Sequence, residues 1–343
     1  MPSCNEATQI EETRFRRSTE LIKCVRSTKA IFMPRIITLT PNPALDYAVH
    51  ADFVDPNRKL RCRDPQTHPG GGGINVARAA SRLGAHVLAI FTAGGVYGDA
   101  LVKAIATENV PMRMIPITGG TRLAFHVSNH RDGDEYRFNL PGAEMSDAEL
   151  NRFFDAVREE TDPDDFVVAS GSLPPGAPED FWAQIARIVK EKKARFVLDS
   201  ISGLDAALAE GVYMLRQNEF EYPALSGKTL SWPDEINAFA QKAVADGLTE
   251  AMVISHGADG SIMATKDGLD FAPSYKVRAN SAVGAGDSFV GGLLTALSRG
   301  ESNENALKFG MAAAGATRMS EGTALFKTAD VIRLYETGSA QGS

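Results

Sequence analysis

The feature that most limits how this chain can fold is an alternation, beginning at Arg35, of short apolar runs with amphipathic helical runs. The apolar runs cover residues 36–40, 87–92, 166–169, 196–199, 213–215 and 251–255. Near-continuous apolar runs of this length are typical of parallel strands that are buried on both faces. The helical runs cover residues 146–159, 178–192, 233–245 and 302–319. Strands and helices in series predict an α/β fold with a doubly wound, mainly parallel sheet flanked by helices.

Two stretches depart from this alternation because no helix lies between their β-like runs. Residues 47–54 alternate and lead into the polar run 55–63, and residues 122–129 and 135–140 flank a hairpin turn. These runs could form an edge extension of the main sheet or a separate, small antiparallel sheet. We expect a separate β-lid over a cleft, with strands from about 47–66 and 120–140.

Charge and cysteine content narrow the possible functions. The formal net charge is −7, which favours neither a nucleic acid nor an anionic membrane as a partner, and no apolar run reaches the ~18 residues of a membrane span. Three scattered cysteines suggest neither a disulfide framework nor a zinc site, which fits a cytoplasmic protein. Residues 1–32 lack the apolar core of a signal peptide, and their acidic residues disfavour a transit peptide. We expect a poorly ordered extension there, followed by a folded domain over 33–343.

The first motif with chemical meaning is the turn Gly284-Ala285-Gly286-Asp287, which leads into an apolar helix. Small residues before a helix let several backbone N–H groups point at one spot, where the helix dipole adds partial positive charge. Phosphate oxygens would bind there. A carboxylate beside phosphate makes sense as a base that takes a hydroxyl proton during phosphoryl transfer. An ordinary helix start with a flexible turn explains the same residues equally well.

A second glycine turn covers residues 70–73 and precedes Asn75, at the start of a helical pattern over 74–83. Backbone without side chains can approach a ligand closely, and the Asn75 amide can hydrogen-bond sugar hydroxyls. The spacing matches neither a dinucleotide-binding fingerprint nor a Walker A loop.

Three further places in the sequence are candidate ligand-binding sites. Asp46 follows the first strand, where ligands bind in parallel sheets, and could recognise sugar hydroxyls or lie in a surface turn. Asn218 and Glu221 could hold a hydrated Mg²⁺ or simply begin a solvated helix. Residues 255–260 end a strand in a glycine turn that could lie along a nucleotide.

Together these pieces resemble the PfkB family of carbohydrate kinases, in the ribokinase superfamily, from about Arg35 to the C-terminal helix. The two signature regions are residues 70–75 and 279–293. The resemblance implies a ribokinase-like kinase domain with a β-sheet lid that also forms a homodimer contact. It implies ATP and Mg²⁺ as cofactors, possible use of K⁺, and a small-molecule sugar phosphate as the partner.

The resemblance also implies roles for individual residues. Asp287 is expected to be the catalytic base, and the anion hole is formed by Gly284, Ala285 and Gly286. The nucleotide site maps to Arg216, Asn218, Ser255, Gly257, Ala258, Gly260, Ala279, Gly284 and Gly286. Glu221 is expected to hold Mg²⁺ through water. The monovalent cation site maps to Ser281, Val283, Thr317, Ser320 and Gly322.

Local features resemble the minor 6-phosphofructokinase branch of the family: residues 59–62, the all-glycine turn 70–73 without a lysine, and residues 135–138. The sugar-phosphate site then maps to Asp46, Lys59, Arg61, Gly71, Gly72, Asn75, Arg122, Arg137 and Ser172. The implied reaction is the glycolytic phosphorylation of fructose 6-phosphate at its 1-hydroxyl, with inhibition by a second MgATP. Residues 40–46 depart toward the 1-phosphofructokinase type, and Arg216 replaces the usual lysine. A 1-phosphofructokinase, a tagatose-6-phosphate kinase and a non-catalytic sensor of sugar phosphates or nucleotides are the alternatives.

Overall fold

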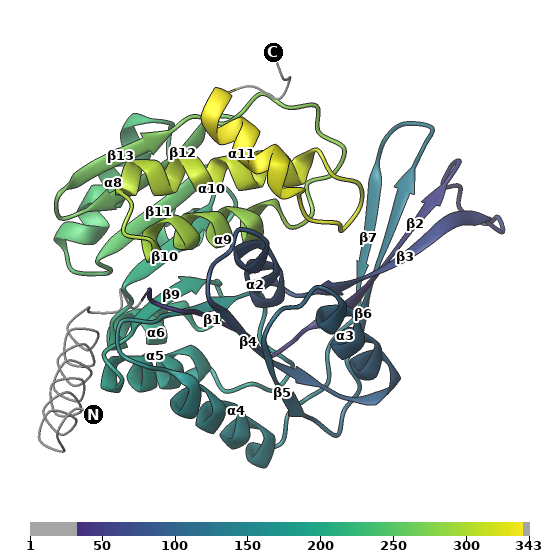
Figure 1. Cartoon of the computed structure of the whole chain (residues 1–343), viewed down its shortest axis with the longest axis horizontal. Coiled ribbons are helices and arrows are strands. Elements are labelled where there is room, and N and C mark those ends of the chain that lie inside the picture. Colours follow the sequence, from purple (N-terminus) through teal and green to yellow (C-terminus); the bar gives the residue numbers. More distant parts are fainter. Residues whose placement is uncertain (1–32, 339–343) are drawn as a thin grey trace, which may run out of the picture. The chain divides into compact units, whose positions relative to one another are not determined.

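Two β-sheets and their helices make up the part of the chain that the computed structural model describes, residues 33–338 (Figure 1). Pro34–Ser343 group into one unit, and the expected extension over residues 1–32 lies outside the described residues. The main sheet has the strand order β13-β12-β11-β10-β9-β8-β1-β4-β5. Its strands are β1 (Ile36–Thr40), β4 (Val87–Ala93), β5 (Met112–Pro116), β8 (Phe166–Ser170), β9 (Arg195–Asp199), β10 (Met214–Asn218), β11 (Ala251–His256), β12 (Gly260–Thr265) and β13 (Gly268–Ala272).

The predicted α/β fold is confirmed. Strands β5-β4-β1-β8-β9-β10-β11 are parallel, and β12 and β13 add an antiparallel edge that the sequence reading missed. Every residue of β1 is buried, with Ile36 in the core on one face of the sheet and Ile37 in the core on the other. Burial on both faces is why the run 36–40 shows no alternation of buried and exposed residues.

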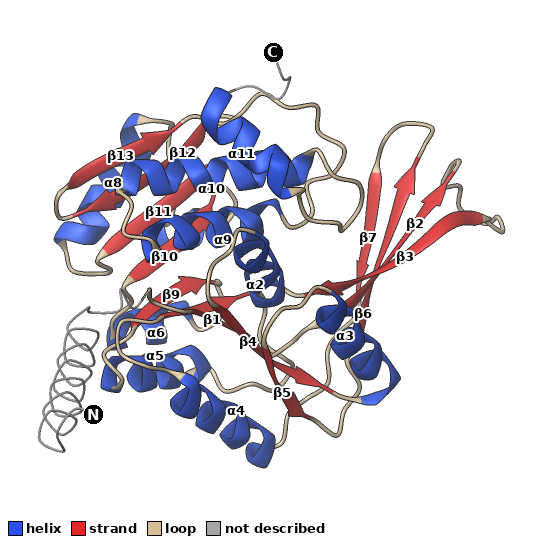
Figure 2. Cartoon of the chain, in the orientation of Figure 1, coloured by secondary structure: helices blue, strands red, loops and turns tan. Residues whose placement is uncertain are grey.

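Helices cover both faces of the main sheet (Figure 2). One core joins the sheet to α2, α3, α9, α10 and α11, and the other joins it to α4, α5, α6 and α8. The helices are α2 (Gly72–Arg82), α3 (Gly95–Thr107), α4 (Asp147–Glu160), α5 (Phe181–Glu191), α6 (Leu204–Glu210), α7 (Tyr222–Ser226), α8 (Asp234–Ala245), α9 (Ala285–Ser298), α10 (Asn303–Arg318) and α11 (Thr328–Thr337). A capping box formed by Ser146 and Glu149 begins α4.

A second, small sheet has the order β3-β2-β6-β7, with β2 (Ala44–Ala51), β3 (Cys62–Gly70), β6 (Arg122–Asn129) and β7 (Glu135–Asn139). It is separate from the main sheet, but the prediction that it is antiparallel was wrong, because β2 pairs with β6 in parallel. The chain passes through β3, α2, β4, α3 and β5 between these two strands, so β6 enters the small sheet from the same end as β2. Strand β3 starts with exposed polar residues, which is why its full extent was missed.

None of the helices in residues 33–338 is both long enough and apolar enough to cross a membrane.

Candidate active site

The carboxyl edge of the main sheet carries a row of polar side chains. Ser170 ends β8, Asp199 ends β9, Asn218 ends β10, and Ser255 is the penultimate residue of β11. Because these strands are parallel neighbours, their ends meet at one edge, where ligands bind in open α/β sheets. The starts of α2 and α9 contribute two further polar residues, Asn75 and Asp287.

Helix α9 begins with the glycine turn that the sequence predicts. Gly284 has a φ of 73°, a left-handed conformation that suits glycine. The i→i−4 hydrogen bonds of α9 begin with the one from Ser288 N to Gly284 O, at 2.9 Å. The N–H groups of Gly286 and Asp287 come before this bond and point out of the helix end, which makes this end suitable for an anion.

The Asp287 carboxylate is held from two sides. The Asn75 amide donates to Oδ2 at 2.9 Å, and Ser170 Oγ lies 3.4 Å from Oδ1. Burial and the nearby charge of Asp199 raise the pKa of Asp287 to about 6, against the opposing effects of Asn75, Arg216 and Ser170. An aspartate with this pKa is ionised at neutral pH and is a stronger base than an ordinary aspartate.

Asp199 and Ser170 are site residues that the sequence reading missed. The Ser170 hydroxyl donates to Asp199 Oδ2 at 2.9 Å, and Arg216 Nη1 donates to Asp199 Oδ1 at 3.0 Å. Arg216 Nη2 also donates to Ser255 Oγ at 2.6 Å, and the side chain is buried. Asp199 is the last residue of an apolar run that was predicted as a strand, so the rule that strand ends face ligands could have found it.

The polar groups of Asn218 and Glu221 form hydrogen bonds within their own turn. The Asn218 N–H donates to Glu221 Oε2 at 3.0 Å, and Asn218 Oδ1 accepts from the N–H groups of Phe220 and Glu221. Burial, then the charge of Asp199, raise the pKa of Glu221. Asp199 also raises the pKa of Asp287, although Arg216 pairs with Asp199 at 3.0 Å. Among the described residues, no three acidic, histidine or cysteine side chains converge to ligate a metal ion directly, so a divalent cation here would be bound mainly through water.

A cavity of about 400 Å³ opens beside this network. Six of the residues predicted to bind the nucleotide line it: Arg216, Asn218, Ser255, Gly257, Ala258 and Gly286. Three others do not line it: Gly260, Ala279 and Gly284. Gly260 instead packs against backbone, since a Cβ there would lie 2.4 Å from Ala272 O. The opposite wall comes from Tyr275 and α10, whose helical pattern in the sequence resembles ordinary core.

Asp46 follows β1 in the chain and lies on β2, inside the small sheet, so the alternative of a surface turn was wrong. It is buried, and a Cβ on Gly70 would come within 2.1 Å of its Oδ1. Burial raises the pKa of Asp46 to about 7; Arg78 and Arg122 act to lower it, and Asp287 acts to raise it further. Asp46 on the small sheet and Asp287 at the start of α9 are therefore close enough for the charge of one to act on the other.

The other residues predicted to bind the sugar phosphate divide into two groups. Arg122 begins β6, and its charge acts on Asp46, while Ser172 accepts a hydrogen bond of 3.1 Å from Asn42. Arg137 pairs with His126 across β6 and β7, on the same face of the small sheet as Asp46.

Lys59 and Arg61 are different. They are exposed and lie beyond the distal end of the β2–β3 hairpin, where Ala51 pairs with Cys62. Ala51 is roughly 17 Å along the strand from Asp46. Within one chain, the structure does not bring these two cations to the cleft, because the hairpin runs away from it (Figure 1).

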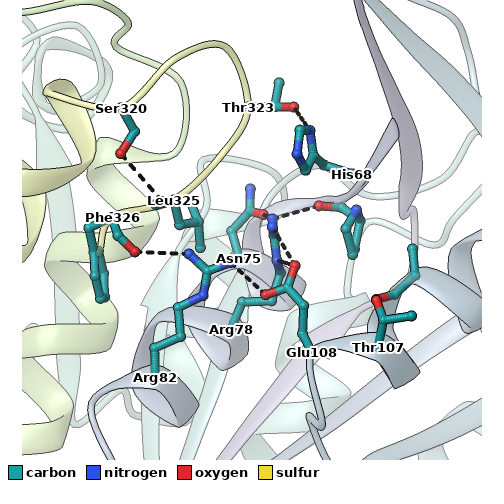
Figure 3. Close-up of polar contacts among 12 residues, drawn as sticks. His68, Asn75, Arg78, Arg82, Thr107, Glu108, Ser320, Thr323, Leu325 and Phe326 are labelled. Atoms are coloured by element: carbon teal, nitrogen blue, oxygen red, sulfur yellow. Dashed lines mark hydrogen bonds and ion pairs between the residues drawn. The ribbon is translucent and has the colours of Figure 1, made fainter. Parts of the chain in front are cut away.

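The residues predicted to hold a monovalent cation lie on two adjacent loops and the end of α10. Ser281 N lies 3.4 Å from Arg318 O, and Ser281 Oγ accepts from Val283 N. The Thr317 hydroxyl is already paired, 2.7 Å from Ser288 Oγ and 3.0 Å from Ala313 O. Gly322 has a φ of 55°, and Ser320 Oγ lies 3.4 Å from Leu325 O (Figure 3). Backbone carbonyls of these loops could serve a cation, and the expected role of the Thr317 hydroxyl oxygen remains a prediction.

Comparison with known sequences gives one family and a consistent set of relatives. A family described as pfkB family carbohydrate kinase matches residues 40–329. ATP-dependent 6-phosphofructokinase isozyme 2 of Mycobacterium tuberculosis is 39% identical over 303 residues, 88% of this chain and 89% of that protein. The isozyme 2 of Escherichia coli is 37% identical over 305 residues, 88% of this chain and 98% of that protein. The 1-phosphofructokinase of Bacillus subtilis is 31% identical over 288 residues, 83% of this chain and 93% of that protein.

Solved structures agree. Phosphofructokinase-2 from E. coli in complex with potassium matches with a TM-score of 0.84 at 37% identity, over 89% of this chain and 99% of that chain. The same protein has been crystallised with fructose-6-phosphate, with a TM-score of 0.83, and in a tetrameric inhibited form. A ribokinase of Arabidopsis thaliana, at 20% identity and a TM-score of 0.69, shares the fold over 89% of this chain and 99% of that chain.

Proposed function

This chain belongs to the pfkB family of carbohydrate kinases, and from that premise we propose that it transfers the γ-phosphoryl group of ATP to the 1-hydroxyl of fructose 6-phosphate. The products are fructose 1,6-bisphosphate and ADP. The observation that carries the proposal is the position of Asp287. It lies at the amino end of α9, next to Gly286 in the lining of the 400 Å³ cavity, its charge acts on Asp46, and Asn75 donates to its carboxylate.

The protein groups divide the chemistry between them. Asp287 takes the proton from the 1-hydroxyl as the bond to phosphorus forms, and its pKa of about 6 keeps it ionised at neutral pH. The N–H groups at the start of α9 stabilise charge on the transferring phosphoryl group. Glu221 and Asp199 would hold a Mg²⁺ ion through water, and the ion would neutralise phosphate charge when bound.

On the acceptor side, Asp46 binds sugar hydroxyls and Arg122 and Arg137 meet the 6-phosphate, since a guanidinium matches phosphate geometry. Lys59 and Arg61 would serve a phosphate only on a neighbouring protomer. A homodimer through the small sheet is supported by its outer face, where Tyr47 stacks on Phe125 with ring centroids 5.7 Å apart. Phe138 on the same face is 53% exposed, and aromatic residues exposed in this way mark interfaces.

Localisation and ion requirements complete the proposal. We place the enzyme in the cytoplasm, in keeping with glycolysis. A K⁺ ion at the loops around Ser281 and Gly322 is supported by the potassium complex of the E. coli relative. Inhibition by a second MgATP is part of the same proposal.

An acceptor panel tests the function. The purified protein is given MgATP with fructose 6-phosphate, fructose 1-phosphate, tagatose 6-phosphate, fructose or ribose, and ADP release is followed by a coupled assay. We expect the highest kcat/KM with fructose 6-phosphate. A preference for fructose 1-phosphate would favour the activity named for the B. subtilis relative. Equal rates with unphosphorylated sugars would contradict a sugar-phosphate specificity, and calorimetric ATP binding without ADP release would indicate a sensor.

A further inference from the structure

Arg78 is a buried charge that the proposed reaction does not use directly. It lies on α2, one helical turn after Asn75, and is 1% exposed. A buried guanidinium is costly unless its donors are paired. Its contacts therefore show what the protein gains from it.

The Arg78 guanidinium joins three elements (Figure 3). Nη1 donates to Pro69 O at 2.9 Å, at the end of β3, and to Asn75 Oδ1 at 2.9 Å. Nε donates to Glu108 Oε1 at 2.8 Å, just after α3, and Nη2 lies 2.6 Å from the same oxygen. The small sheet, α2 and α3 thus meet at one side chain.

Arg82 shares the same carboxylate but serves a different segment. Its Nη2 donates to Glu108 Oε2 at 2.7 Å, and its Nη1 donates to Phe326 O at 3.0 Å. Burial acts to raise the pKa of Glu108, but the hydrogen bonds and charges of Arg78 and Arg82 outweigh it and lower that pKa. The polar partners of Arg82 among the described residues are Phe326 and Glu108, not Asn75, which makes Arg82 a matched control.

The contact with Asn75 has a chemical consequence. An asparagine amide has an accepting oxygen on one side and a donating NH₂ group on the other. Because Arg78 can only donate, it keeps Oδ1 of Asn75 on its own side, and Nδ2 then faces Asp287 at 2.9 Å. The reversed amide would set donor against donor at Arg78 and oxygen against carboxylate at Asp287.

We propose that Arg78 is a positioning residue for phosphoryl transfer: it fixes the Asn75 amide in the orientation that donates to Asp287, and it ties that orientation to the end of β3. The β3 end matters because Pro69 pairs with Leu45 and Gly70 lies against Asp46. One side chain therefore sets the position of both carboxylates that face the reacting hydroxyl. This inference rests on the proposed role of Asp287.

Loss of this amide orientation should change the pKa of Asp287 in a predictable direction. Asp287 is faced by Asp199 from β9, Arg216 from β10, Asp46 from β2 and Ser170 from β8. Replacing Arg78 leaves Asp199, Arg216 and Ser170 in place and releases the fixed donor, Asn75, whose hydrogen bond lowers the pKa of Asp287. It also removes a charge that lowers the pKa of Asp46. The pKa of Asp287 then rises, and the acid limb of the kcat–pH profile moves to higher pH.

The test compares Arg78→Met with Arg82→Met, using ADP release with the best acceptor of the panel. We expect Arg78→Met to lower kcat by about 10- to 100-fold, the effect of a lost hydrogen bond to a charged group, with a smaller change in the KM for ATP. Its acid limb should move up by roughly one pH unit. Arg82→Met should lose a similar amount of thermal stability while its acid limb stays in place.

Two further variants keep the test decisive if Arg78→Met folds poorly because Glu108 loses a partner. The pairs Arg78→Met/Glu108→Gln and Arg82→Met/Glu108→Gln remove the unpaired charge and repeat the comparison. In an Asn75→Ala background, Arg78→Met should have little further effect on kcat. An unmoved acid limb in both Arg78 variants, or additive effects with Asn75→Ala, would overturn the inference while an active wild type leaves the proposed function standing. A wild type that turns over no acceptor would overturn both.

Discussion

The starts of α2 and α9 are alike in sequence, since each is a glycine turn followed by a helix with a polar residue near its beginning. At α2 the protein itself fills the space next to the glycines. A Cβ on Gly70 would meet the Asp46 carboxylate at 2.1 Å, and one on Gly72 would meet Ser170 Oγ at 2.3 Å. At α9 the nearest atoms are the ends of flexible side chains, with Arg216 Nη2 3.3 Å from a Cβ on Gly286.

The two turns therefore have different roles. The α2 turn lets protein groups approach one another, and so it shapes the cleft. The α9 turn leaves backbone N–H groups facing the cavity, and so it is suited to bind a ligand. The same sequence signature of glycine before a helix does not separate these two cases, because the difference depends on residues far away in the chain.

The largest effect should come from the carboxylate on the α9 turn. Asp287→Asn removes the proposed base while keeping its size, and kcat should fall by about 10²- to 10⁴-fold with little change in thermal stability. Asp147 occupies the matching first turn of α4 and is exposed, so Asp147→Asn should leave kcat unchanged. A near-normal kcat for Asp287→Asn would contradict the claim that the α9 turn, unlike the α2 turn, carries the catalytic base.

The second prediction contrasts the glycines themselves. Gly72→Ala places a Cβ 2.8 Å from the Gly171 backbone nitrogen, and we expect a loss of about 1–3 kcal/mol in the free energy of unfolding. Gly286→Ala should keep the stability, since alanine favours helix, but should raise the KM for ATP because the methyl group crowds the Arg216 side of the cavity. Urea unfolding and ATP kinetics of both variants measure the contrast. A stable Gly72→Ala variant with only a KM defect would show that both turns bind ligand.

Much of the fold could be predicted because parallel strands buried on both faces must be mostly apolar along their length, as residues 36–40 are. The pairing of the small sheet could not be predicted, because five elements lie between β2 and β6 in the chain. In the site, local glycine and strand-end patterns indicated Asp287 and Asn218. Arg78 was missed because its meaning depends on Pro69 and Glu108, and a helix pattern shows only that the position faces inward.

The third prediction compares Asp287 on the α9 turn with Asp46, which lies against Gly70 of the α2 turn. Asp287 must be ionised to act as a base, and its pKa of about 6 places the midpoint of the acid limb of kcat near pH 6. One pH unit below that midpoint, kcat should be roughly a tenth of its plateau value. The kcat/KM for the sugar phosphate reports the free enzyme, in which Asp46 has a pKa of about 7, so that profile should fall at higher pH and more steeply. Coincident profiles would contradict a separate role for Asp46.

The smallest effect is a gain in stability at the α2 side. An aspartate whose pKa is raised by folding opposes folding as the pH rises through its unfolded value of 3.8, and the full cost is present above its folded pKa of about 7. That raised pKa is already the net result of burial against the attraction of Arg78 and Arg122, so Asp46→Asn should raise the free energy of unfolding above pH 7. Urea unfolding should show this gain vanishing below pH 3.8, while kcat/KM for the sugar phosphate falls. A variant that is less stable than the wild type at high pH would mean that the arginines hold Asp46 more tightly than burial disfavours it, and that the α2 turn encloses an ion-paired carboxylate instead of a strained one.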